Sequence, residues 1–71
     1  MYQLPDIELV SEKVHNAWMK SKLDQGITSR LSETGEEMMK PYKELSEPCK
    51  QLDRNTVKAV YNAIEETYWM E

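Results

Sequence analysis

The chain has 71 residues, a formal net charge of −4 and a single cysteine, Cys49. This length allows one domain, residues 1–71, with a modest core and no deep cleft between domains. The acidic balance disfavours nucleic-acid binding through a basic face. One cysteine excludes an internal disulfide and a cysteine-built zinc site.

The N-terminal residues contain neither a basic region nor an apolar run, so we expect no signal peptide. No apolar stretch approaches the length that spans a membrane. With the lone cysteine, these features predict a cytoplasmic protein that contacts neither a membrane nor nucleic acid.

The first predicted helix covers residues 6–25. Asp6 follows Pro5 and is a good N-cap, while Gly26 supplies the left-handed residue that commonly ends a helix. One face carries an apolar stripe about 100° wide, which we expect to face the core. Its members are Ile7, Val10, Val14, Ala17, Trp18 and Ser21.

Residues 27–41 are predicted to form a loop, because small polar residues and Gly35 dominate them. Residues 36–40 suggest one short helical turn that Pro41 ends, with Met38 and Met39 closing over one end of the core. We expect the adjacent pair Glu36 and Glu37 to be solvated.

The second predicted helix covers residues 46–66, because Ser46 is a good N-cap and Pro48 fits the first turn. Leu45 stands where a hydrophobic staple would. The predicted core stripe is Cys49, Leu52, Thr56, Val60, Ala63, Ile64 and Thr67, edged by Lys50, Val57, Tyr61 and Tyr68. The fold class expected is mainly α, with two antiparallel helices joined by a loop or short helical turn. Residues 68–70 could also pair with residues 1–4 as short β-strands.

His15, Trp18 and Lys22 lie on adjacent turns of the first helix, since their spacings are three and four. They could form a binding surface with an aromatic plane, an imidazole and an ammonium group for an anion. Alternatively, Trp18 belongs to the core, His15 is a half-buried hydrogen-bonding residue and Lys22 is solvated.

Asp53 lies within the apolar stripe of the second helix, where an ionised carboxylate is costly unless it is paired. It could accept hydrogen bonds from the preceding loop or from His15, or it could cap a new helical segment. A third interpretation is a polar pocket in which Lys50 and Arg54 present positive charge to an anionic ligand.

No catalytic site, metal site or cofactor motif is recognisable. His15 and Cys49 are the only residues of their types and are far apart in sequence, so an enzyme using them ranks last. Gly-rich phosphate loops and paired metal-ligand spacings are missing from the sequence.

The ordered set of residues resembles the RyR domain, a small module of ryanodine receptors that also occurs in bacterial and phage proteins. The similarity covers about residues 7–69. The matching residues are His15, Trp18, Gly26, Pro41-Tyr42, Leu45, Lys50, Asp53-Arg54-Asn55, Val57-Lys58-Ala59-Val60, Ile64 and Tyr68.

The resemblance implies a helical, non-enzymatic module, and in bacteria and phages a nucleotide-binding role. That role fits the candidate residues found from the helix spacing, so the ligand-binding residues we predict are His15, Trp18, Lys22, Tyr42, Lys50 and Arg54, with Asp53 as an internal polar tie. The usual Gly-Trp-x-Tyr-Gly turn is replaced by residues 26–30, so the ligand or its affinity is expected to differ. A protein-interaction or homo-oligomerisation module is the alternative, suggested by aromatic residues near both termini.

Overall fold

The computed structural model describes residues 4–68, which form two α-helices and a connecting segment. Helix α1 spans Ile7–Asp24, helix α2 spans Glu47–Tyr68, and a short 3-10 helix, η1, spans Tyr42–Glu44. The predicted mainly helical fold, with its loop and short helical turn, is confirmed. No strand occurs within residues 4–68, where the only β pairing is an isolated bridge.

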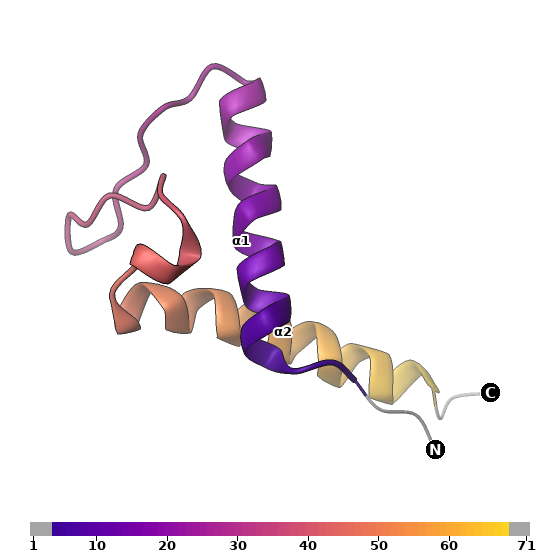
Figure 1. Ribbon diagram of the computed structural model, residues 1–71. Helices are drawn as coiled ribbons and strands as arrows, with labels where there is room; N and C mark the ends of the chain where they lie inside the picture. The colour runs from indigo at the N-terminus through magenta and orange to yellow at the C-terminus, as the bar shows by residue number, and fades with distance from the viewer. Residues whose placement is uncertain (1–3, 69–71) are drawn as a thin grey trace.

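The two helices cross steeply instead of running antiparallel along their lengths (Figure 1). The N-terminal part of α1 lies against the middle of α2, and the C-terminal half of α2 extends beyond the crossing. Two polar pairs join the helices, His15 with Asp53 and Glu8 with Arg54. These pairs favour a local crossing over a long apolar contact between the helices.

Both ends of α1 follow from local sequence signals. The Asp6 carboxylate accepts hydrogen bonds from the backbone N–H groups of Glu8 (3.1 Å) and Leu9 (3.3 Å), as a capping residue does. Gly26 has φ +80°, and the N–H of Ile27 reaches the carbonyl of Lys22 at 2.9 Å. This is a Schellman ending, which requires the left-handed conformation that glycine adopts without strain.

Helix α2 begins directly after Ser46, whose carbonyl accepts the first helical hydrogen bond, from the Lys50 N–H at 2.9 Å. The Ser46 hydroxyl instead donates to Glu36. The helix continues to Tyr68, so the prediction of a strand at Tyr68 is wrong. The rest of the predicted strand pair, residues 1–3 and 69–70, lies outside the described part of the chain.

The connecting segment contains a hairpin-like turn, and its helical turn lies later than predicted. Leu31 and Glu37 form an antiparallel bridge, and Gly35, with φ +88°, occupies the turn between them. Residues 36–40 are therefore not helical, and the single helical turn is η1, after Pro41. The difference arises because Glu37 hydrogen-bonds back to the preceding loop.

The buried core is small and lies between η1 and the start of α2. Tyr42, Leu45 and Cys49 form one buried cluster, with Met38 packed against it as predicted. Val57, on α2, is the other buried hydrophobic residue in the described chain. Such a core gives a thin margin of stability.

The buried face of each helix is rotated away from its predicted apolar stripe. On α1, Ser11 and His15 are buried, whereas Val14 is exposed. On α2, Val57 from the predicted edge is buried, whereas Leu52 and Val60 from the stripe centre are 54% and 52% exposed. The prediction that these stripes face the core is wrong for their exposed members, although Cys49 of the predicted stripe on α2 is buried as expected. Polar side chains, among them His15 and Asp53, join the helices instead.

Candidate functional site

A buried histidine joins α1 to both α2 and the connecting segment. His15 is 3% exposed, its Nε2 lies 2.8 Å from the Lys40 carbonyl oxygen, and its Nδ1 lies 3.1 Å from Asp53 Oδ2. The carbonyl can only accept, so Nε2 carries a proton, and a second proton lies between Nδ1 and Asp53. Burial raises the pKa of Asp53, and the neighbouring His15 opposes this shift.

Arg54 makes the second link between the helices. Its Nε and Nη2 both donate to the Glu8 carboxylate, Nη2 at 3.0 Å, and its Nη1 donates to Glu47 at 2.9 Å. The hydroxyl of Tyr42 donates to the same Glu8 carboxylate at 3.1 Å. The guanidinium lowers the pKa of Glu8, and the carboxylates of Glu8 and Glu47 raise the pKa of Arg54. All three nitrogens of Arg54 are therefore engaged inside the molecule.

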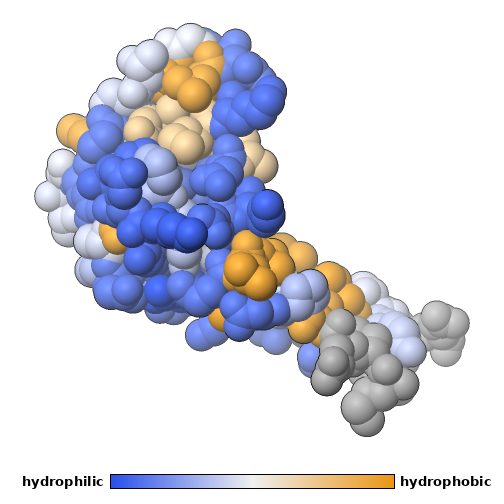
Figure 2. Space-filling model, in the orientation of Figure 1, coloured by the Kyte–Doolittle hydropathy of each residue, from blue (hydrophilic) through white to orange (hydrophobic). Residues whose placement is uncertain are grey.

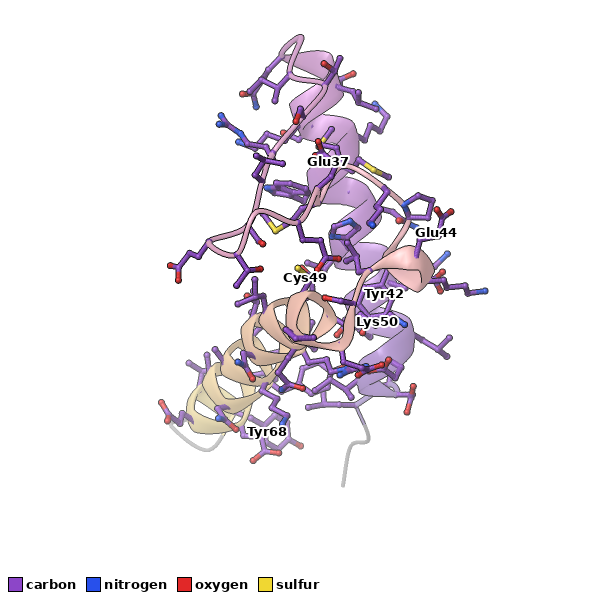
Figure 3. All side chains as sticks on the ribbon, turned by 90° about the vertical axis from the view of Figure 1, so that its left-hand side faces the viewer. Glu37, Tyr42, Glu44, Cys49, Lys50 and Tyr68 are labelled. Atoms are coloured by element: carbon purple, nitrogen blue, oxygen red, sulfur yellow. The ribbon has the colours of Figure 1, made fainter. Side chains whose placement is uncertain are left out.

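Lys50 lies above the ring of Tyr42, with Nζ 5.6 Å from the ring centroid, in cation–π geometry. Its Nζ is also 4.0 Å from Glu47. Figure 3 shows Tyr42 and Lys50 close together near the start of α2. Tyr42 is 4% exposed, so its ring belongs to the core and offers no open plane for a ligand.

Glu36 and Glu37 are structural residues, which corrects the prediction that they are solvated. Glu36 accepts from the Ser46 N–H at 2.9 Å, from the Ser46 hydroxyl, and from Cys49 Sγ at 3.2 Å. The bonds from Ser46 are the main reason that the pKa of Glu36 is lowered to about 2. Glu37 binds the Ser29 hydroxyl and two backbone N–H groups, which lowers its pKa as well.

An open groove of about 290 Å³ lies where the two helices and the connecting segment meet. It is lined by Val14, His15, Trp18, Met38, Leu45, Cys49, Leu52, Asp53 and Thr56. A second hollow of about 360 Å³ shares Met38, Cys49 and Leu52 with it, so the two are continuous along α2. No lysine or arginine of residues 4–68 lines the groove.

The six predicted ligand-binding residues divide into two groups. His15 and Trp18 line the groove beside Asp53, with ring centroids 5.4 Å apart. Three others, Tyr42, Lys50 and Arg54, do not line it and instead pack against or pair with residues of the fold. Lys22, the sixth, lies one turn beyond Trp18 on α1 and is half-buried.

The sequence interpretation missed the apolar walls of the groove. Val14 and Thr56 lie on predicted core stripes, so nothing in the pattern marked them as groove residues. The partners of Arg54 were also missed, although Glu47 stands seven residues before Arg54 on the same helix and could have been found from that spacing. Glu8 lies on another helix and left no sequence signal.

Cys49 and His15 both line the groove, yet their polar atoms have other partners. Cys49 Sγ donates to Glu36, and both ring nitrogens of His15 are engaged by Lys40 and Asp53. Within residues 4–68, no group of three or more metal-ligating side chains is close enough to hold an ion. Neither described helix has the length and apolarity needed to cross a membrane.

These features define a small helical module in which two crossed helices and an ordered connecting segment surround one shallow, largely apolar groove. The chain belongs to the RyR domain family, whose sequence profile matches residues 3–70. No curated protein and no solved structure matches the chain.

Proposed function

We propose that the chain is a non-catalytic module that binds a small nucleotide-like molecule in the groove at the helix crossing, as a sensor or sequestering protein. The observation that carries this proposal is the groove itself, in which an indole and a buried histidine–carboxylate pair stand among apolar side chains. Its volume, about 290 Å³, is at the lower end of the range for small-molecule sites, about 300–1,000 Å³.

The planar part of such a ligand would lie against Trp18, with Met38 and Leu52 as apolar neighbours. Aromatic rings stack on every base, because each base has a π face. Asp53 accepts hydrogen bonds and supplies a polar edge to the groove, which suits the amino group of a base.

The anionic part of the ligand would lie toward Lys22. This residue is one helical turn from Trp18, is partly exposed, and forms no ion pair within residues 4–68. Arg54 and Lys50 support the proposal less, because Glu8 and Glu47 already neutralise them. The module proposed here needs no cofactor, and a cytoplasmic location is consistent with its free, buried Cys49.

Isothermal titration calorimetry with a panel of NAD-derived and cyclic nucleotides tests this function. We expect one class to bind, and Trp18→Ala to weaken its affinity by about 5- to 150-fold, the range expected for loss of one stacking contact. Leu23→Ala, at an exposed apolar residue of α1 outside the groove, is the matched control and should bind normally. Absence of heat with the whole panel, or unchanged binding by a folded Trp18→Ala variant, would contradict the proposal.

A protein-interaction role is the second candidate, and one observation favours it. The predicted core stripe of α2 is largely uncovered within residues 4–68, although most of its residues are apolar. Figure 2 shows hydrophobic residues gathered over the part of α2 that extends beyond the crossing.

A further inference from the structure

The uncovered face of α2 is a continuous apolar stripe. Its members, which we call the α2 stripe, are Leu52, Thr56, Val60, Ala63, Ile64 and Thr67, all exposed. Their spacings of three and four residues place them on one side of the helix. The hydroxyls of Thr56 and Thr67 donate to the helix carbonyls of Leu52 (3.1 Å) and Ala63 (2.9 Å). These threonines therefore have no free hydroxyl proton to offer to solvent, which suits a stripe that packs against apolar groups.

The dimensions of the chain indicate how much surface a partner would cover. The radius of gyration is 14.1 Å, against about 11 Å for a compact domain of this length. The accessible surface is 5396 Å², roughly 800 Å² more than the ~4,600 Å² expected for a compact monomer of 8.4 kDa. Each partner in a standard protein–protein interface buries about 800 Å². The excess surface therefore matches one such interface.

The stripe is complementary to itself in the antiparallel direction. A twofold axis between Ala59 and Val60 brings Leu52 opposite Thr67 of the second copy, and Thr56 opposite Ala63, so that larger side chains meet smaller ones. The central residue Val60 then lies close to its own counterpart.

Charge also favours the antiparallel direction over the parallel one. Glu65 and Glu66 lie in the last turn of α2, where the helix dipole disfavours carboxylates. An antiparallel neighbour places Arg54 and Asp53 of its own α2 opposite Glu65 and Glu66, and so keeps the two acidic helix ends apart. A parallel neighbour would place the acidic ends side by side.

We propose that two copies of the chain associate through antiparallel contact of their α2 stripes, and that each copy closes the groove of the other. Leu52 and Thr56 belong both to the stripe and to the groove wall. In the pair, the segment from Ala63 to Thr67 of one copy therefore lies over the groove mouth of the other. The closing role rests on the proposed ligand site, whereas the association itself does not depend on a ligand.

Sedimentation equilibrium of the full chain without ligand tests the association. We expect a mass of twice 8.4 kDa that falls toward the monomer on dilution. Val60→Lys should raise the dimer dissociation constant by roughly 100-fold or more, because it brings two like charges together in an apolar contact. Leu23→Lys is the control: Leu23 is 53% exposed, nearly the same as Val60 at 52%, and lies on α1 outside the stripe. A monomer at every concentration, or a folded Val60→Lys variant that dimerises normally, would overturn the proposal.

A charge-swap mixture tests the twofold geometry independently of folding defects. Val60→Lys and Val60→Glu should each be monomeric, and mixing them should restore a dimer, because Val60 lies close to its own counterpart across the proposed twofold axis. Failure to restore the dimer, with both variants helical by circular dichroism, would overturn the antiparallel pairing. Because these measurements use no nucleotide, they stand or fail separately from the calorimetric test of ligand binding.

Discussion

His15 and Asp53 form the polar contact on which the position of the groove depends. His15 donates to the Lys40 carbonyl, so its Nδ1 can accept a hydrogen bond from a protonated Asp53 or, as imidazolium, donate one to an ionised Asp53. Either state satisfies both side chains at 3.1 Å. The contact therefore holds α1, α2 and the connecting segment together at one edge of the groove.

Substitution of Asp53 tests this contact. Asp53→Ala leaves His15 Nδ1 without a partner in a buried position, and should lower the free energy of unfolding by about 1–3 kcal/mol. Asp53→Asn should cost much less, because an amide N–H can donate to Nδ1. Urea denaturation near neutral pH measures both values. Equal losses for the two variants would show that the hydrogen bond to His15 is not the relevant interaction.

The sequence was informative about single residues that act locally and about one long-range pair. Asp6 and Gly26 could be assigned to helix ends because their partners lie within a few residues. His15 could be named as a partner of Asp53, because a carboxylate on an apolar stripe needs one. Arg54 was assigned to a ligand because the Glu8 carboxylate that binds it lies on another helix, and no local pattern marks such a pair.

At the scale of elements, the connecting segment is held by Glu36 and Glu37 instead of by an apolar core of its own. Glu36 ties the segment to the start of α2 through Ser46 and Cys49. Glu37 ties it to the loop after α1 through Ser29 and a backbone N–H. Met38 directly follows Glu37 and lines the groove. By fixing this segment, the two carboxylates therefore position one wall of the groove.

These ties predict a specific sensitivity to acid. The pKa of Glu36 is lowered from 4.5 to about 2, so its stabilising contribution is present above about pH 4.5 and is lost as pH falls toward 2. Thermal unfolding followed by circular dichroism should show the wild-type midpoint falling over this range. Glu36→Gln should lower the midpoint at neutral pH and flatten its fall with acid.

Glu33→Gln is the matched control for this acid effect, because Glu33 is an exposed glutamate of the same segment. Its acid response should follow the wild type. If Glu36→Gln also followed the wild type at every pH, the tie between Glu36 and Ser46 would not contribute to stability.

At this scale, the ends of the helices could be predicted from the sequence, whereas their buried faces could not. Caps and breakers gave the bounds of α1 within one residue and the start of α2, because those signals act over single turns. Apart from Cys49, the buried faces were largely mispredicted, since we assumed that the most apolar face of each helix packs inside. Here the crossing is fixed by polar partners, and Val60 and its stripe remain exposed.

For the molecule as a whole, membership of the RyR domain family, the crossed helices and the groove beside the crossing support one interpretation. A core of four buried hydrophobic residues in the described chain leaves apolar surface uncovered on both helices. We propose that this surface serves binding, the groove for a small molecule and the α2 stripe for a second copy. The basic residues Lys50 and Arg54 then serve the fold.

Mapping of amide and indole NMR shifts during titration with the best-binding nucleotide tests the central claim most directly. The account predicts that the largest changes lie at the Trp18 indole N–H and at Val14, Met38 and Leu52, with small changes at Arg54. Changes centred on Arg54 and Lys50, or the absence of change at Trp18 in the presence of measurable binding, would contradict it.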